Sequence, residues 1–318
     1  MPNPETPDAT SSPAVFVPSP ADLNREASAS PISKPQLRVF VIAVTVLVAC
    51  FSVLLYRWCQ FGLRSDLFSY TLMVPFISGY LIWTNKNKLS FGPPARGLAF
   101  LFATMGGAVL VLFGLLSKSA GWAPSTQIAL TTLSFILIFL AICAAVLGGK
   151  FLRSALFPLG FLIFMVPLPA SAEYAFESFL QYGSAYASYI LLKLAGNSMY
   201  FEGTTFMLPG ITLEVAPECS GIRSTLVLFL TSLIAGHLFL RNNWNKAILA
   251  SVVIVLGIAR NALRIFTLAQ LCVHVSLDWI DSPLHHRGGP IFFALSLIPL
   301  FFLLWYLRKR ERRAYSAK

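Results

Sequence analysis

The stretch APECSGIRSTLVLFLTSLIAGHLFL, residues 216–240, passes within a few residues from a polar turn to an uncharged apolar run. No Asp, Glu, Lys or Arg follows Arg223 before Arg241, and a helix of that length crosses most of a lipid bilayer. Several comparable apolar runs recur along the chain, separated by short polar segments. The stretch therefore predicts an integral membrane protein built from helices, with its chemistry concentrated where polar turns meet the spans.

The composition supports this fold class. Of 318 residues, 56% are hydrophobic and 12% are charged, and the mean hydropathy is +0.71. A soluble domain is nearer one quarter charged, so we expect an all-α, multi-spanning membrane protein. The net charge of +11 arises from residues between the apolar runs and at the C-terminus. This placement indicates membrane topology, with lipid rather than nucleic acid as the partner.

The five cysteines show no CxxC spacing and no His/Cys cluster typical of a metal site. No metal and no cofactor is predicted. Cys50, Cys143 and Cys272 lie in apolar runs and are expected to be small packing residues.

The apolar pattern predicts three regions. Residues 1–36 are rich in Pro, Ser and Ala and form a disordered tail, residues 37–307 form the membrane domain, and residues 308–318 form a basic tail. Eight spans are predicted within the membrane domain, at 39–56, 67–83, 98–116, 127–147, 154–167, 220–240, 247–273 and 291–307. Residues 173–195 are expected to form an amphipathic helix at the outer interface. Residues 204–215, with Pro209-Gly210 at their centre, predict a short β-hairpin before the cysteine.

The loop charges predict the orientation. Basic loops at 85–96, 148–153 and 241–246 and the basic tail are assigned to the cytoplasm by the positive-inside rule. Eight spans with both termini in the cytoplasm satisfy all four assignments, and a ninth span at 173–195 would not. Cys219 and the polar loop 274–290 then fall on the outer face.

Cys219 is the candidate nucleophile. Pro217 suits a first helical position, which would place Cys219 in the first turn of the span, where the helix dipole favours a thiolate. Arg223 follows four residues later, on the same face of that helix, and would add to the effect.

Two arginines inside a span are a separate signal. Arg260 and Arg264 must face a protein interior or a wet cavity, because buried charges in a bilayer are costly. At 1.5 Å per residue, Arg264 lies roughly 27 Å from Lys246 along the helix, near the outer membrane edge. Asn261 lies three residues from Arg264. Arg264 is thus expected to reach the outer mouth, where a guanidinium would stabilise an oxyanion or hold a carboxylate.

His285 and His286 stand just before the last span and supply a general base and acid of the kind that thiol acyl transfer uses. The residues alone leave other interpretations open. A cysteine at a helix start is often structural, and the intramembrane arginines equally suit an ion pair or the path of a transporter, channel or assembly factor.

The motif Pro-Glu-Cys-Ser-Gly-Ile-Arg-Ser (217–224) resembles that of exosortases, as do Asn261-Ala-Leu-Arg264 and His285 with Gly289 and Phe293. Similar residues also occur at 70–83, 166–169 and 196–215, so the resemblance covers roughly residues 40–305. Exosortases belong with archaeosortases to one superfamily of polytopic membrane cysteine transpeptidases.

The resemblance implies a thiol protease or transpeptidase of the bacterial inner membrane, with its active site on the periplasmic face. Its partners would be exported proteins with a C-terminal sorting signal: a Pro-Glu-Pro-like motif, a transmembrane helix and a basic tail. A thioester would form and pass to an unknown acyl acceptor, often in bacteria that make exopolysaccharide. By the same resemblance Cys219, Arg264 and His285 are catalytic, with Arg260 and His286 as alternates. The alternative is a non-enzymatic transporter or an exopolysaccharide-export subunit.

Overall fold

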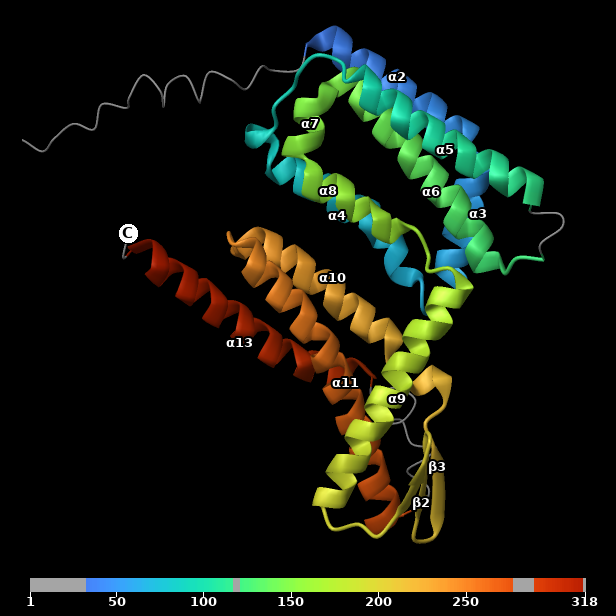
Figure 1. Ribbon diagram of the computed structural model, residues 1–318, viewed down its shortest axis with the longest axis vertical. Helices are drawn as coiled ribbons and strands as arrows, with labels where there is room; N and C mark the ends of the chain where they lie inside the picture. The colour runs from blue at the N-terminus through green and yellow to red at the C-terminus, as the bar shows by residue number, and fades with distance from the viewer. Residues whose placement is uncertain (1–32, 117–120, 277–288, 317–318) are drawn as a thin grey trace, which may run out of the picture.

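The computed structural model describes residues 33–116, 121–276 and 289–316. Two groups of helices diverge from the long helix α9 (Ala170–Leu194), and a small sheet lies beyond them (Figure 1). The first group contains α2 (Lys34–Cys50), α3 (Ser52–Arg64), α4 (Val74–Thr84), α5 (Arg96–Leu116), α6 (Pro124–Ile142), α7 (Gly148–Ser154) and α8 (Leu156–Phe161). The second group contains α10 (Ile222–Phe239), α11 (Asn243–His274) and α13 (Gly289–Ser316).

Short helical turns connect these elements. They are η1 (Ser69–Met73), η2 (Lys86–Lys88), η3 (Cys143–Leu147), η4 (Leu162–Met165) and η5 (Pro217–Cys219). The predicted basic turn at 148–153 is formed by α7, which reverses the chain between α6 and α8 (Figure 1). Helix α2 begins at Lys34, inside the predicted tail of 1–36, and the tail up to residue 32 lies outside the described residues.

Five helices in the described part of the chain are long and apolar enough to span a membrane, or up to seven candidates if each of two bent pairs is one span. Eight spans were expected. The first predicted span is divided by a 70° bend between α2 and α3. The second predicted span forms η1 and the 11-residue α4, which is too short to cross by itself. The fifth predicted span joins α9 through a 93° bend at residues 166–169, where two prolines interrupt the helix.

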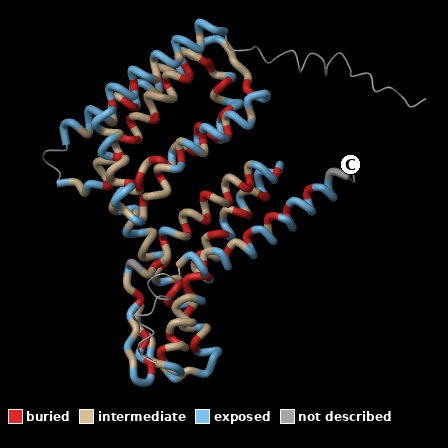
Figure 2. Tube along the Cα trace, turned by 180° about the vertical axis from the view of Figure 1, so that it is seen from behind, coloured by how far each residue is buried: buried red, intermediate tan, exposed pale blue. Residues whose placement is uncertain are grey.

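Lipid-facing surface is abundant on the first group. Helix α5 is uncharged along its apolar window, of which only 6% is buried. Its large apolar side chains, such as Phe100 and Val111, are exposed, and exposed positions run along its length in Figure 2. A helix that leaves such residues uncovered is stable in hydrocarbon rather than in water.

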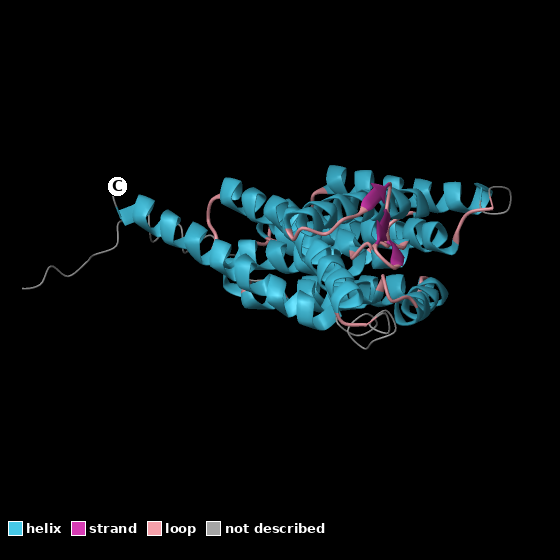
Figure 3. Cartoon of the chain, turned by 90° about the horizontal axis from the view of Figure 1, so that it is seen from below, coloured by secondary structure: helices cyan, strands magenta, loops and turns pink. Residues whose placement is uncertain are grey.

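The predicted hairpin forms part of a three-stranded antiparallel sheet. Strands β2 (Thr205–Leu208) and β3 (Ile211–Glu214) meet at Pro209-Gly210, and Gly210 adopts φ +82° there. Strand β1 (Tyr200–Glu202) adds a further strand beyond the predicted hairpin. The sheet, whose strands are magenta in Figure 3, packs against α9 and α11. Its Phe206 is fully buried in this contact. The apolar side of the sheet is therefore covered by protein.

Helices α10 and α11 pack closely. A Cβ added at Gly257 of α11 would lie 2.6 Å from Thr225 Oγ1 of α10, so glycine permits the close approach. Leu228, Leu249 and Val253 are fully buried between these helices and α13. The turn between α10 and α11 is held by Glu311 of α13, whose carboxylate accepts hydrogen bonds from the backbone N–H groups of Arg241 and Asn242 and from Asn245 Nδ2.

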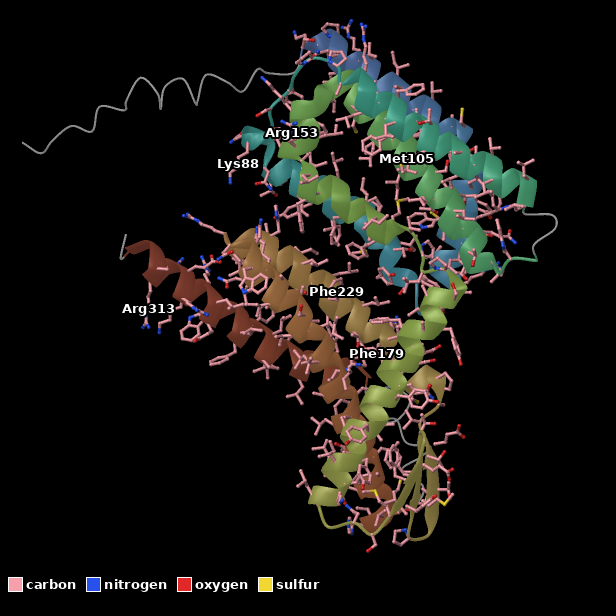
Figure 4. The ribbon with its side chains drawn as sticks, in the orientation of Figure 1. Lys88, Met105, Arg153, Phe179, Phe229 and Arg313 are labelled. Atoms are coloured by element: carbon pink, nitrogen blue, oxygen red, sulfur yellow. The ribbon has the colours of Figure 1, made fainter. Side chains whose placement is uncertain are left out.

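Basic segments gather toward one end of the molecule. Lys88, Arg153 and Arg313 lie at the same end in Figure 4, as does the turn between α10 and α11. Cys219 lies at the other end of α10, just before its first residue. The four basic segments that were assigned to one side of the membrane thus share one end of the fold.

Candidate active site around Cys219

The backbone around Cys219 forms two distinct turns rather than one helix start. Pro217 to Cys219 form the 3-10 turn η5, and α10 begins only at Ile222. Between them Gly221 adopts φ +77°, a left-handed conformation that interrupts helical geometry. The prediction that Cys219 lies in the first turn of the span is therefore wrong, and Arg223 is not its neighbour on a continuous helix face.

Helix α11 supports this turn from the side. Asn261 Nδ2 donates a 2.7 Å hydrogen bond to the carbonyl oxygen of Cys219, and Arg260 Nη2 lies 3.4 Å from the carbonyl oxygen of Gly221. Both side chains are buried. A Cβ at Gly221 would lie 2.6 Å from Arg260 Nη2 and 3.1 Å from Asn261 Cγ. The glycine is thus required both by its φ angle and by the approach of α11.

Cys219, Asn261 and Arg264 line one cavity of about 240 Å³. Strand β3 and the following Val215 form another wall of this cavity, and Ile265 and Leu268 of α11 also line it. The hydrogen bond from Gln181 Nε2 to the carbonyl oxygen of Val215, 2.6 Å long, ties this wall to α9. Three of the sequence-predicted residues are therefore brought together, although they come from two separate segments.

Arg264 also borders a second, larger cavity of about 710 Å³. Its lining includes Asp66 from the first helix group, Glu173 and Glu177 from α9, and Arg223 from α10. Arg223 lies 3.4 Å from the carboxylate of Asp66, and both side chains are largely exposed. The structure thus places Arg223 at the second cavity, whereas Cys219 lines the first.

The acidic members of this lining were not predicted as site residues. Glu173 and Glu177 stand four residues apart, so they share a face of α9. Two carboxylates on one face of an otherwise apolar segment are the sequence feature that could have identified Glu173 and Glu177 as site residues. The contribution of Asp66 depends on contact between distant helices, which no local pattern indicates.

Two polar atoms beside the cysteine are buried with no hydrogen-bond partner among the described residues: Ser220 Oγ and Asn261 Oδ1. Most buried polar atoms in folded proteins are paired, and exceptions often occur at functional sites. Among the described residues, Asn261 forms a hydrogen bond through its Nδ2 group, and its Oδ1 atom has no hydrogen-bond partner.

The candidate bases His285 and His286 lie outside the described residues. Within the described residues, no group of three or more His, Cys, Asp or Glu side chains is arranged to hold a metal ion.

Comparison with known proteins places the chain in a family. The model of the family described as "Transmembrane exosortase (Exosortase_EpsH)" matches residues 58–302, which include the cysteine turn, α11 and the start of α13. No curated protein and no solved structure matches. Together with its apolar helices, this match shows that the chain is a multi-pass membrane protein that belongs to the family of transmembrane exosortases.

Proposed function

We propose that the protein is a membrane cysteine transpeptidase that cleaves C-terminal, Pro-Glu-Pro-type sorting signals of exported proteins and transfers the new carboxyl end to an acceptor. The observation that carries the proposal is that Cys219 and Arg264 line the same cavity, while Arg264 also borders the larger one. A nucleophile, a fixed positive charge and room for a peptide thus meet at one place.

The chemistry follows from these groups. The Cys219 thiolate attacks the carbonyl carbon of the scissile peptide bond, a C–S bond forms, and the carbonyl oxygen becomes an oxyanion that faces Arg264. Collapse breaks the C–N bond, and the leaving amine takes a proton from His285 or His286 as general acid. A hydroxyl or amine of the acceptor, or water, then attacks the thioester carbonyl carbon and gives its proton to the same histidine, now a general base; the C–S bond breaks and the thiolate is restored.

Strand β3 supports a mode of peptide binding. Within the described residues it is an edge strand, because β2 pairs with it on one side and the sheet order ends there. Thr212 and Glu214 of this strand are exposed, and they line the cavity that Cys219 also lines. An extended peptide adds readily to such an edge through backbone hydrogen bonds. The scissile segment would then run along β3 toward Cys219.

The length of α11 supports an outer position for the site. The 32 residues of α11 extend about 48 Å at 1.5 Å per residue, which exceeds a hydrocarbon core of about 30 Å. Asn261, which contacts Cys219, lies 18 residues after Asn243, or about 27 Å along the helix. With the basic end in the cytoplasm of a bacterial inner membrane, both termini are cytoplasmic and Cys219 lies near the periplasmic edge.

The alternative, a transporter or an exopolysaccharide-export subunit, would use the intramembrane arginines along a path. Arg260 is buried and directed at the Gly221 carbonyl, which suits a structural role. Arg264 at two cavities fits either function. The two proposals differ in the need for a thiol, since a transport path does not require the sulfur of Cys219.

The test is to co-express a tagged substrate that carries the sorting signal with Cys219→Ala and Cys219→Ser, using Cys50→Ala as the matched control. Cys50 is an exposed cysteine away from the site. Processing is expected to be lost in both Cys219 variants and retained in Cys50→Ala. Undiminished processing by Cys219→Ala would contradict the proposal. If Cys219→Ser retains function and Arg264→Ala loses it, the result would favour the transporter.

A further inference from the structure

A second site lies at the opposite end of α10 from Cys219. There a cavity of about 510 Å³ is lined by η2 of the first helix group, by the end of α10 and its following turn, and by α13. Because α10 has 18 residues, about 27 Å along its axis separates this cavity from the cysteine turn. The cavity therefore belongs to neither of the two described above.

The lining is strongly cationic. Lys88, Arg241, Arg308 and Arg312 contribute positive charges from three segments that are far apart in the sequence. Among the described residues of the lining, Glu311 is the single acidic one, and its carboxylate accepts the two backbone N–H groups and the Asn245 amide already noted. In the described part of the chain, no carboxylate forms an ion pair with Lys88, Arg308 or Arg312.

Topology alone does not require this convergence. The positive-inside rule places basic residues on one side of the membrane, but it does not bring them together in a hollow. Like charges that converge repel one another, and the repulsion is relieved by a bound anion. The lining also includes the apolar residues Leu238, Phe239 and Leu240, and the Arg308 guanidinium lies 5.4 Å from the centre of the Phe239 ring. A lining that combines cationic groups with apolar side chains suits a lipid headgroup with its attached glycerol.

The cavity also lies where the two helix groups face each other. Lys88 belongs to the first group, whereas Arg308 and Arg312 belong to the second. Nearby, the groups touch through aromatic rings, with Phe157 stacked on His237 at a centroid distance of 3.9 Å. An anion between Lys88 and α13 would connect the two groups by charge.

We propose that this cavity binds a phosphate-bearing anion, and that the headgroup of an acidic membrane phospholipid is its source. Basic pockets between transmembrane helices at the cytoplasmic side recognise such headgroups. Arginine guanidinium groups donate paired hydrogen bonds to phosphate oxygens, and lysine adds a point charge. The proposal does not involve Cys219 and stands independently of the peptidase reaction.

The experiment measures binding to the purified full-length protein in non-ionic detergent. Short-chain dioctanoyl phosphatidylglycerol, dioctanoyl phosphatidylcholine and inorganic phosphate are titrated separately, with calorimetry as the readout. The test variant is Lys88→Gln combined with Arg312→Gln. The matched control is Lys86→Gln combined with Arg313→Gln, which removes the same charge from the same two segments at exposed positions that do not line the cavity.

We expect phosphatidylglycerol to bind at least tenfold more tightly than phosphatidylcholine. The test variant should weaken its binding tenfold or more, while the control changes it less than twofold. If inorganic phosphate binds with the same dependence on Lys88 and Arg312 and as tightly as the lipid, the anion site stands but a soluble phosphate is its ligand. Equal weakening in both variants, or no preference for the anionic lipid, would overturn the site. Thermal unfolding of both variants without ligand checks that neither change has disturbed the fold.

Discussion

Replacing Gly221 by alanine gives the sharpest test of how the cysteine turn is built. Gly221 has φ +77°, and an alanine in this left-handed region costs about 1–2 kcal/mol. Its Cβ would also displace Arg260 Nη2, 2.6 Å away, and the lost contact to the Gly221 carbonyl adds about 1 kcal/mol, since that bond is long. The free energy of unfolding should therefore fall by about 2–3 kcal/mol.

Two other glycines separate the contributions. Gly210 has φ +82° with open space around its Cβ position, so Gly210→Ala measures backbone strain alone. Gly257 has no such φ angle, but its Cβ would press on Thr225, so Gly257→Ala measures crowding, offset by a gain of about 1 kcal/mol in helix propensity. Denaturant titration in detergent micelles gives the three free energies of unfolding. Gly221→Ala should lose more than Gly210→Ala by about 1 kcal/mol.

The same variant should change the cysteine itself. Asn261 Cγ must also move, because it would lie 3.1 Å from the new Cβ, and its amide holds the Cys219 carbonyl. We expect an altered rate of Cys219 modification by a water-soluble maleimide, measured in a background with Cys50 and Cys59 replaced by serine. If Gly221→Ala matches the wild type in both stability and labelling rate, the packing of α11 against the turn does not control the site.

Three further predictions concern neighbouring contacts. Asn261→Ala should reduce the free energy of unfolding by about 1–3 kcal/mol, because the Cys219 carbonyl loses its donor, and Asn261→Asp should not restore it at neutral pH. Arg223→Gln should change stability by no more than about 0.5 kcal/mol, since its ion pair with Asp66 is exposed, and a larger loss in denaturant titration would contradict this. Glu311 lies beyond the apolar part of α13. Burial raises the pKa of its carboxyl group, but hydrogen bonds from Arg241, Asn245 and Asn242 have the larger combined effect. The pKa is therefore held below its ordinary value near 4.5. Its stabilisation is therefore present above about pH 4.5 and is lost as the pH falls below that value, and Glu311→Gln should flatten this part of the stability profile measured by thermal unfolding.

Local sequence patterns were sufficient to predict those elements whose structure depends on neighbouring residues in the chain. Long apolar runs predicted α5, α10, α11 and α13, because every backbone group in a bilayer must be paired within a helix. Pro209-Gly210 predicted the turn of the hairpin, since glycine alone adopts φ +82° there without strain. Prediction was poorer at the spans that bend or shorten, where hydrophobicity does not reveal the break.

The same division holds at the candidate site. The sequence by itself determined that this is a helical membrane protein of the exosortase type, with Cys219, Asn261 and Arg264 as residues of interest, because residue type and spacing carry that information. Tertiary structure alone decided that Cys219 precedes the helix, that Arg223 turns to Asp66, and that Arg264 borders two cavities. These outcomes depend on how α9, α10, α11 and the sheet pack against one another, and contacts between distant segments leave no periodic pattern in the chain.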